Sequence, residues 1–518
     1  MASHRSWRWL ILLLTAVLLP GCGVAQEKRE TGIVYEIFVG SFADSDGDGV
    51  GDLKGIESKL DYIASLGADS IWLTPIHPSP SYHHYDVMDY YAVAPEFGTL
   101  EDFDALAAAC AEKGIGIILD LVVNHTSSEH PWFLSACDDL KAGRTDGLQD
   151  DFIFSQSSGQ HPVPGTEDWY YEGAFGSHMP DLNLDCPGVR QEIASIIAFW
   201  QDHGVKGFRL DATTSYYTGN TARNTAFLQF ITESAKAGDP DCYVVGEAWT
   251  NENTILEMYQ SGIDSLFNFP ASAAEGVIVK AASKGKGANV ADKLAAWNEK
   301  IKAVSPAALD APFLSNHDQA RSRGMLGSNP KQMKAAAMLY LLLPGRPFVY
   351  YGEEIGMSGS GRDENKRLPM LWSGADETQN CLPPAEADQA QRLTDGVDAQ
   401  EGDPDSLLNW YRQLGRIREM NPALIGGRMR AIETDNAALC AYTVASDGVS
   451  LAVLINTSLK ENAEIDASAM GLAGYACLDA LGADAEALNA GLRSGGASLP
   501  PIACAVLQGP ESPILIAP

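Results

Sequence analysis

The stretch GIGIILDLVVNH, residues 114–125, is an apolar run that ends in two polar residues, Asn124 and His125. Such a run is typical of a parallel strand that is buried on both faces. Seven further runs of this kind alternate with helical patterns along the chain: GIVYEIFV (32–39), ADSIWLTPI (68–76), VKGFRLDA (205–212), CYVVGEAW (242–249), IDSLFNF (263–269), APFLSNHD (311–318) and RPFVYYGEE (346–354). Eight strands with intervening helices predict an α/β fold, the TIM (β/α)8 barrel.

The segments between these runs indicate helices and two additional domains. Apolar residues recur at helical spacing in 99–114 and 189–204, and both segments end in Gly, as helices often do. We assign 31–124 and 181–429 to the barrel. Residues 125–180 are too many for a loop and predict a subdomain inserted after strand three. Short alternating strands predict a C-terminal antiparallel β-domain, a β-sandwich, over 430–518.

Polar residues gather where the predicted barrel strands end, which is the face that carries the active site in such barrels. Strand four ends in Arg209 and Asp211, strand five in Glu247, and strand seven in His317 and Asp318. Most of the 68 acidic residues are expected to be solvated surface groups. Three acids that each follow an apolar run would instead share one cleft, where like charges push their pKa values apart.

The segments DLVVNH, GFRLDA, GEAW and SNHD resemble, in order and spacing, the four signature regions of the α-amylase family, glycoside hydrolase family 13. The resemblance extends from Ile33 to Trp372 and includes MPDLNLD (179–185) and RPFVYYGEEIGM (346–357). It implies the catalytic residues Asp211 as nucleophile, Glu247 as general acid/base and Asp318 as a third carboxylate that binds sugar hydroxyls. It also implies retention of configuration through a covalent glucosyl intermediate.

Further substrate residues follow from the same resemblance. Arg209 would hold the nucleophile ionised, and His125 and His317 would hydrogen-bond the sugar at the cleavage point. HHYDVMDY (83–90) is similar to the segment in which a Tyr, here Tyr85, stacks under the sugar ring and an Asp, here Asp86, contacts its hydroxyls. RLPMLW (367–372) is similar to exo-acting α-glucosidases, so Arg367 would close the pocket; surface placement is the alternative for an Arg.

The acidic stretch DSDGDGVGDLKG, residues 44–55, raises the question of a bound cation. It is not an EF-hand, because position 12 counted from Asp44 is Gly55, which has no ligating side chain. The stretch resembles the calcium loop that follows strand one in several subfamilies of the α-amylase family. The resemblance implies a structural Ca2+, with a solvated acidic turn as the alternative, and these ligands: Asp44, Asp46, Asp48, Asp52 and the backbone carbonyl of Val50.

The start of the chain predicts export. His4, Arg5 and Arg8 precede the apolar run WLILLLTAVLLP (9–20), which is too short to span a bilayer and is typical of a secretory signal. LPGC resembles a lipoprotein lipobox, so we assign 1–22 to a signal segment with Cys22 lipidated and 23–30 to a linker. The expected location is extracellular: the protein would be a lipoprotein attached to the cell membrane and facing outward. Plain secretion is the alternative.

Composition excludes several other partners and cofactors. The net charge of -32 disfavours nucleic acid and acidic membrane surfaces, so we expect membrane contact only through the lipid anchor. The cysteines after Cys22 lack CxxC spacing, which argues against zinc. Export permits disulfides, whereas buried thiols are the alternative for Cys110 and Cys242.

The substrate predicted from these observations is an α-glucan or malto-oligosaccharide. Export favours an α-amylase that shortens starch outside the cell. However, typical α-amylases have Lys-His three and four residues after the nucleophile, where this chain has Thr214 and Ser215. An α-glucosidase or oligo-1,6-glucosidase is therefore the alternative, and a non-catalytic sugar-binding relative is a more remote one.

Overall fold

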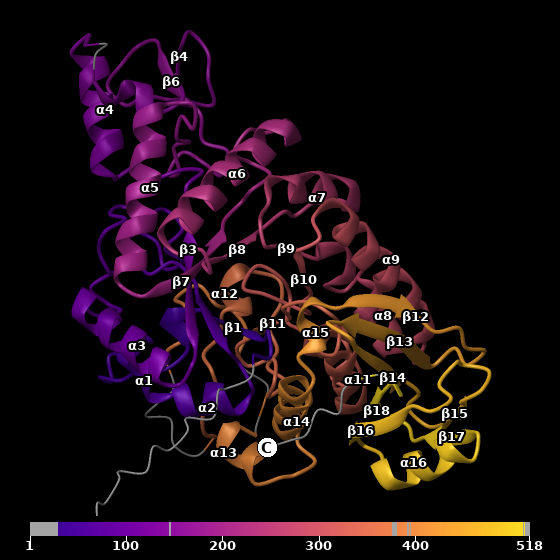
Figure 1. Ribbon diagram of the computed structural model, residues 1–518. Helices are drawn as coiled ribbons and strands as arrows, with labels where there is room; N and C mark the ends of the chain where they lie inside the picture. Colours follow the sequence, from indigo (N-terminus) through magenta and orange to yellow (C-terminus); the bar gives the residue numbers. More distant parts are fainter. Residues whose placement is uncertain are drawn as a thin grey trace, which may run out of the picture.

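Eight parallel strands form the central sheet in a computed structural model of the chain, which describes residues 30–144, 147–374, 381–390, 393, 395–510 and 512 (Figure 1). Their order is β10-β9-β8-β7-β3-β2-β1-β11. In chain order the strands are β1 (Val34–Ile37), β2 (Ser70–Leu73), β3 (Gly116–Leu121), β7 (Val205–Leu210), β8 (Tyr243–Gly246), β9 (Ser265–Phe267), β10 (Leu309–Ala311) and β11 (Phe348–Tyr350).

The sheet closes into a barrel between β10 and β11, the two strands at its ends. The backbone N–H of Arg346 donates to the carbonyl of Asp310 at 2.8 Å, and that of Phe348 donates to the carbonyl of Pro312 at 2.9 Å. Apolar side chains from all around the sheet fill the interior, namely Val34, Trp72, Ile118, Val245, Phe267, Phe313 and Phe348. The predicted TIM barrel is confirmed.

The seventh strand differs from its prediction. We expected it over 311–318, but β10 covers Leu309–Ala311 and only an isolated bridge, from Phe313 to Phe348, continues it. The regular ladder stops because Pro312 has no N–H to donate. The polar residues that follow, up to Asp318, therefore lie on an irregular segment at the mouth of the barrel.

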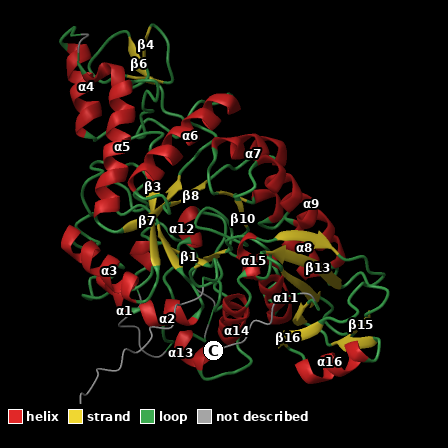
Figure 2. Ribbon diagram, viewed as in Figure 1, coloured by secondary structure: helices red, strands yellow, loops and turns green. Residues whose placement is uncertain are grey.

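Helices surround the strands, as Figure 2 shows in red around yellow. The helix predicted over 99–114 is α3 (Leu100–Glu112), which begins with a capping box between Thr99 and Asp102 and ends before Gly114, whose φ is +65°. The one predicted over 189–204 is α5 (Pro187–Asp202). The other helices of this part are α1 (Leu53–Ser58), α2 (Leu60–Ser65), α6 (Thr221–Gly238), α7 (Glu252–Met258), α8 (Val277–Lys284), α9 (Ala288–Val304), α10 (Ser322–Met325), α11 (Pro330–Leu341), α12 (Asp363–Lys366), α13 (Val397–Glu401), α14 (Leu407–Met420), α15 (Ala423–Gly426) and the 3-10 turns η1 (Val39–Ser41), η3 (Tyr259–Ser261) and η4 (Phe269–Ala271).

The segment inserted between β3 and α5 forms a small domain of its own, at the top of Figure 1. It holds α4 (Pro131–Lys141), η2 (Leu148–Asp151) and an antiparallel sheet of order β4-β6-β5, with β4 (Phe154–Gln156), β5 (His161–Pro162) and β6 (Trp169–Tyr171). The ring of Phe133 packs against Phe152 and Tyr171 at centroid distances of 5.1 and 4.9 Å. A bridge between His125 and Asp181 joins the two ends of the insertion beside the barrel mouth.

The C-terminal part consists of antiparallel strands in two sheets, as its alternating pattern predicted. The sheets are β12-β13-β14-β18-β16 and β15-β17, and α16 (Ala485–Arg493) lies beside them; the strands are β12 (Arg428–Ala431), β13 (Leu439–Ser446), β14 (Val449–Asn456), β15 (Ala463–Asp466), β16 (Ala476–Leu481), β17 (Gly496–Leu499) and β18 (Ala503–Gln508). Side chains from both sheets form one core, including Leu439, Leu454, Ile465 and Leu499. The hydroxyl of Tyr442 donates to the carbonyl of Leu342 at 2.8 Å and fixes this domain on the barrel.

The eight cysteines in the described residues are all free thiols, and all but Cys186 are buried. They are Cys110, Cys137, Cys186, Cys242, Cys381, Cys440, Cys477 and Cys504. In the described part of the chain, no helix has the length and apolar character needed to cross a bilayer.

Candidate active site

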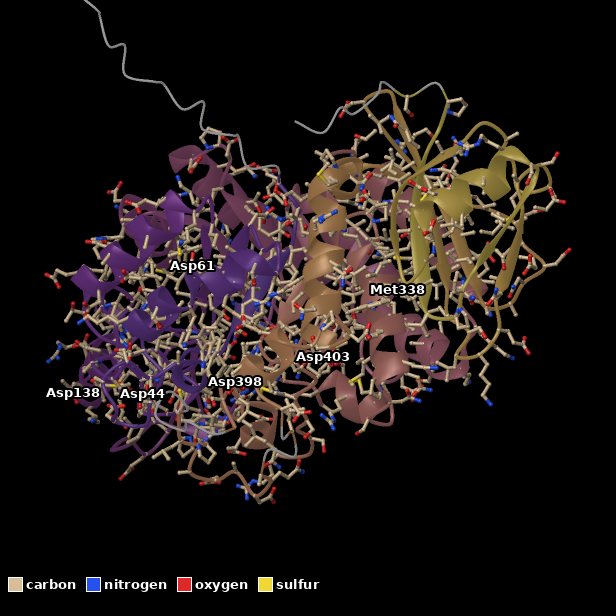
Figure 3. All side chains as sticks on the ribbon, turned by 90° about the horizontal axis from the view of Figure 1, so that it is seen from below. Asp44, Asp61, Asp138, Met338, Asp398 and Asp403 are labelled. Carbon is tan, nitrogen blue, oxygen red and sulfur yellow. The ribbon has the colours of Figure 1, made fainter. Side chains whose placement is uncertain are left out.

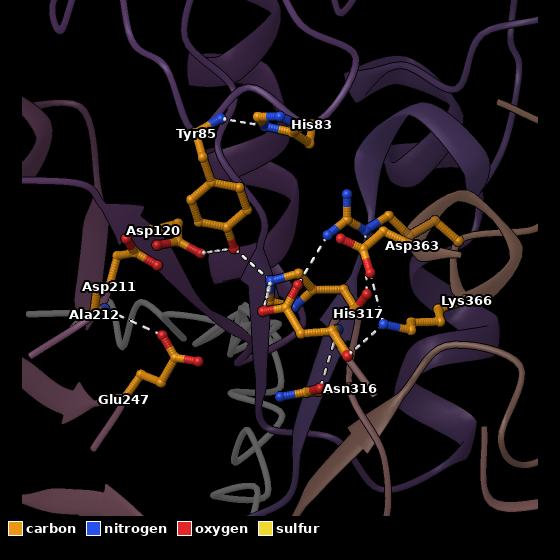
Figure 4. Close-up of polar contacts among 12 residues, drawn as sticks. His83, Tyr85, Asp120, Asp211, Ala212, Glu247, Asn316, His317, Asp363 and Lys366 are labelled. Carbon is orange, nitrogen blue, oxygen red and sulfur yellow. Dashed lines mark hydrogen bonds and ion pairs between the residues drawn. The ribbon is translucent and has the colours of Figure 1, made fainter. Parts of the chain in front are cut away.

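A cavity of about 510 Å³ opens at the C-terminal ends of the barrel strands. Its wall combines carboxylates with imidazoles, aromatic rings and one guanidinium: His83, Tyr85, His125, Phe175, His178, Met179, Asp211, Ala212, Glu247, Trp249, Asp318, Asp363 and Arg367. The three acids that were expected to share a cleft do share it. Figure 4 shows Asp211 and Glu247 on one side of the cavity and His317 on the other.

Strand register brings the first two carboxylates together. In the parallel pair β7–β8, Leu210 lies opposite Gly246, so the next residues, Asp211 and Glu247, leave the barrel side by side. Between them lies the guanidinium of the fully buried Arg209. Its Nη1 donates to Oδ1 of Asp211 at 2.8 Å, and its Nη2 lies 2.8 Å from Oε2 of Glu247.

The surroundings of Glu247 shift its pKa and fix its position. Burial, together with the neighbouring charges of Asp211 and Asp318, raises the pKa of Glu247 to about 7 despite the opposing effect of Arg209. The backbone N–H of Ala212 also donates to Oε2 of Glu247 at 3.1 Å. Ala212 has a φ of +47°, a left-handed conformation that is unusual for a residue with a Cβ. The chain therefore bends sharply directly after Asp211, at the site itself.

The third carboxylate, Asp318, is held by two cations. Oδ2 lies 3.1 Å from Nε2 of His317, and Oδ1 accepts a hydrogen bond from Nη2 of Arg367 at 2.9 Å. Burial acts to raise the pKa of Asp318, but these cations outweigh it and hold the pKa well below its usual range. Arg367 is only 3 % exposed and lines the cavity, so the alternative of surface placement is wrong.

His317 lies between two carboxylates, one of which the sequence did not single out. Nδ1 lies 2.7 Å from Oε1 of Glu36 on β1, and the backbone N–H of His317 donates to the same oxygen at 3.2 Å. Burial alone would lower the pKa of His317, but Asp318 and Glu36 raise it to about 10. The imidazole is therefore a buried imidazolium at neutral pH, with a fixed orientation.

Tyr85 forms the floor of the cavity between these groups. Its hydroxyl donates to Oδ2 of Asp120 at 2.9 Å and lies 2.7 Å from Nε2 of His317 (Figure 4). Asp120 is fully buried and accepts from Arg209 at 2.9 Å, and burial raises its pKa to about 6. The hydroxyl of Tyr85 is therefore fixed in place, and the residue lines the cavity.

Two of the predicted substrate residues are placed differently from each other. His125 lines the cavity and its Nε2 lies 3.2 Å from the carbonyl of Tyr85. Asp86 is 2 % exposed and does not line the cavity, because its Oδ1 accepts hydrogen bonds from the hydroxyls of Ser79 and Ser81. Its contact with sugar hydroxyls stays a prediction.

Several residues of the site escaped the sequence analysis. Glu36 and Asp120 sit inside strands, where the one-dimensional pattern gives a buried acid no distinct signal. Trp249 is part of the GEAW motif but lies on the rim with 55 % of its surface exposed, stacked on Phe269 at 5.0 Å. An exposed Trp beside a cavity is the signal that only the structure supplies.

The acidic loop after β1, where Figure 3 labels Asp44, contributes no residue to the lining of this cavity. Carboxylate oxygens of Asp44, Asp46 and Asp48 lie within 4.8 Å of one another. Asp52 is not part of this cluster: its two oxygens accept backbone N–H groups of Gly55 at 2.7 Å and Ser45 at 2.8 Å, so it caps α1. The structure thus brings together three of the four predicted carboxylate ligands. Val50 belongs to the same loop, and its N–H donates to Asp48 at 2.7 Å.

A barrel that gathers Asp211, Glu247 with its raised pKa and the strongly held Asp318 around one cavity can carry out acid/base chemistry on a neutral polyhydroxyl substrate. The family described as "Alpha amylase, catalytic domain" matches residues 36–427. "Alpha-amylase 3" of Dictyoglomus thermophilum is 40% identical over 464 residues, which cover 87% of this chain and 90% of that protein. "Glucan 1,6-alpha-glucosidase" of Streptococcus pneumoniae is 32% identical over 480 residues, covering 79% of this chain and 88% of that protein.

Solved structures agree with these sequence matches. Eubacterium rectale Amy13B has a TM-score of 0.86 and 40% sequence identity, over 92% of this chain and 95% of that one. The α-amylase from H. orenii has a TM-score of 0.81 and 33% identity, over 93% of this chain and 100% of that one. Fold and site together define a glycoside hydrolase. The chain belongs to the α-amylase family, glycoside hydrolase family 13.

Proposed function

We propose that the protein hydrolyses α-glucosidic bonds of starch and malto-oligosaccharides with retention of configuration, as an α-amylase. The observation that carries this proposal is the position of Asp211 and Glu247 on two nitrogens of one guanidinium, with Asp318 in the same cavity. One guanidinium can contact both groups only if they are close, and closely spaced carboxyl groups are typical of retaining enzymes. The presence of all three acids argues against a non-catalytic sugar-binding protein.

The electrostatics suit the two chemical steps of such a reaction. Asp211, paired with Arg209, attacks the anomeric carbon and forms a glycosyl ester, while Glu247 gives its proton to the departing glycosidic oxygen. Glu247, now ionised, then removes a proton from the water that hydrolyses the ester. A pKa of about 7 suits a group that must first donate and then accept a proton near neutral pH.

Asp318 would hold the sugar through its hydroxyls. Because His317 and Arg367 keep it ionised, it accepts hydrogen bonds from the substrate across the whole range in which Glu247 titrates. Tyr85 would offer its ring to the apolar face of the same sugar, and His125 would donate to a hydroxyl. The assignments of Asp86 and Arg367 belong to this same sugar position.

The bond that is cut and the length of the product separate two candidates. The 40% identity to "Alpha-amylase 3" and the exposed Trp249 on the cavity rim favour a long glucan that extends out of the cavity. An α-glucosidase or oligo-1,6-glucosidase is favoured by the buried Arg367, which narrows one side of the cavity, and by the 32% identity to "Glucan 1,6-alpha-glucosidase".

Product analysis tests both candidates. The purified protein, supplied with amylose, isomaltose and pullulan, should release a ladder of malto-oligosaccharides from amylose and leave isomaltose uncut. Release of glucose alone, together with cleavage of isomaltose, would establish the alternative. A protein that releases no reducing sugar from any of the three would disprove the proposed function.

We further propose that the loop from Asp44 to Asp52 binds a structural Ca2+. Three clustered carboxylates are hard oxygen donors, and the carbonyl of Val50 adds a neutral one, which suits Ca2+ rather than a softer metal. Asp52 would then reach the ion only by sharing an oxygen that now accepts a backbone N–H. The ion would neutralise a loop that otherwise repels itself.

We propose that the protein is exported and anchored through a lipid on Cys22, a residue that lies outside the described part of the chain. The apolar run at 9–20 and the LPGC sequence support this location, and plain secretion is the alternative. Wild-type protein should fractionate with membranes, whereas Cys22→Ala should not. A wild-type protein found only in the medium would support plain secretion instead.

A further inference from the structure

A second cavity, of about 520 Å³, lies among η4, α8 and α9 and is lined by five lysines. They are Lys280, Lys284, Lys286, Lys293 and Lys300, five of the 17 lysines in the sequence. The chain as a whole carries 68 acidic against 36 basic side chains. A local concentration of ammonium groups is therefore the opposite of what the rest of the surface offers.

Most of this positive charge is not neutralised inside the cavity. Lys280 pairs with Glu275 at 2.7 Å and Lys300 with Glu252 at 3.2 Å, and these are the acids that line the cavity. The remaining three, Lys284, Lys286 and Lys293, make no ion pair within 4.0 Å in the described part of the chain. The cavity thus holds about three uncompensated positive charges, which attract an anion.

This lysine-lined cavity borders the active-site cavity. Trp249 lines the active-site cavity, and Glu252, three residues later, lines the lysine cavity. On the opposite segment, Phe269 stacks on Trp249 at 5.0 Å with an interplanar angle of 14°, and the next residue, Pro270, lines the lysine cavity. A stacked pair of aromatic rings thus lies between segments that line the two cavities.

We propose that the lysine-lined cavity binds phosphate groups carried by the α-glucan substrate. The inference rests on the proposed function, because it assigns a substrate class to the same cleft. A phosphate ester carries a charge of about -1.5 to -2 at pH 7 and three acceptor oxygens, which matches three free ammonium groups. The carboxylates around the cleavage point repel such a group, so a phosphorylated sugar is bound away from Asp211 while an unsubstituted one is cut.

The test compares two substrates and three triple variants. Phosphorylated amylopectin and the same material after phosphatase treatment are hydrolysed at low ionic strength, where charge interactions are least screened. The variant Lys284→Ala/Lys286→Ala/Lys293→Ala should lower the ratio of kcat/KM for phosphorylated over dephosphorylated substrate by about tenfold, mostly through KM. The charge-matched control Lys54→Ala/Lys141→Ala/Lys206→Ala, which removes three lysines outside the cavity, should leave the ratio unchanged.

A triple Lys→Arg variant keeps the charge and should keep the wild-type ratio. The proposal is wrong if the alanine variant keeps the ratio, or if the control lowers it equally, since the effect would then belong to net charge. A variant that loses binding of inorganic phosphate in calorimetry yet keeps the substrate ratio also overturns it, because the site would then serve the free ion. If neither substrate is hydrolysed by the wild type, the proposed function fails; if both are hydrolysed with equal kcat/KM, only this inference fails.

Discussion

The active-site cavity and the loop from Asp44 to Asp52 both concentrate carboxylates, but they hold them in opposite ways. In the cavity, Asp211 and Glu247 come from different strands and meet the buried guanidinium of Arg209. In the loop, the acids lie within a few residues of one another, and their oxygens accept N–H groups of the same loop, such as that of Gly49 to Asp44 at 2.8 Å.

The two regions differ in the cations that neutralise their carboxylates. The cavity supplies its own cations: His317 and Arg367 hold the pKa of Asp318 low, whereas burial raises the pKa of Glu247 against the opposing effect of Arg209. The described residues include no Lys, Arg or His within ion-pair distance of Asp44, Asp46 or Asp48. The cations of the cavity are thus part of the chain, whereas the proposed Ca2+ would have to come from solution.

The largest expected effect is on the nucleophile. Asp211→Asn keeps the size of the side chain but cannot form a glycosyl ester, so kcat on starch should fall by about four orders of magnitude. The measurement is release of reducing sugar, with the melting temperature recorded to show that the variant is folded. Asp363→Asn, which changes a carboxylate that lines the same cavity but contacts Lys366 rather than Arg209, is the control and should retain far more activity. An Asp211→Asn enzyme that retains wild-type activity would remove Asp211 from the mechanism.

The next effect concerns the proton on Glu247. Because its pKa is raised to about 7, the protonated form disappears as the pH rises through 7, and kcat/KM should fall on that alkaline side. Glu247→Gln should lower activity on starch by about a thousandfold. It should retain much more of its activity on α-maltosyl fluoride, whose leaving group needs no proton. Equal losses on both substrates would show that Glu247 is not the general acid.

Much of this arrangement was predictable, and what was not has a physical reason. The runs GFRLDA and GEAW place an acid directly after a buried strand, and a parallel barrel must collect such residues at one end. Glu36 and Asp120 were missed because an acid inside an apolar strand is explained only by its partner on another strand. The end of β10 was missed because Pro312 stops the ladder within an otherwise apolar run.

A smaller effect is expected at Glu36, which acts on the reaction only through His317. In Glu36→Gln, His317 loses one of its two carboxylates, so its pKa should fall from about 10 toward its ordinary value. The imidazolium, and its grip on Asp318, would then be lost as the pH rises through the lowered pKa. We expect kcat/KM of Glu36→Gln to stay near the wild-type value at pH 5.5. At alkaline pH it should be about tenfold below that of the wild type at the same pH.

The matched control is Glu353→Gln, which changes another buried glutamate that accepts from Ser315 at 2.8 Å and does not line the cavity. It should alter stability without changing the shape of the pH profile. If both variants change the profile alike, Glu36 acts through general stability and not through His317.

The loop should give no direct effect on chemistry, and this is the sharpest contrast with the cavity. If Ca2+ binds the folded loop alone, it stabilises the protein by about 2.7 kcal/mol at a hundredfold excess over its Kd. A chelator should therefore lower the melting temperature, while turnover well below that temperature stays constant. Asp48→Ala should melt at the temperature of the chelator-treated wild type and respond little to added Ca2+.

The control is Asp403→Ala. It removes an exposed carboxylate that accepts a local N–H, from Asp405 at 2.9 Å, but does not belong to the cluster, so its response to chelator should match that of the wild type. A wild-type melting curve that ignores the chelator would leave the loop an acidic turn, whereas a change of turnover in the folded enzyme would make the ion regulatory.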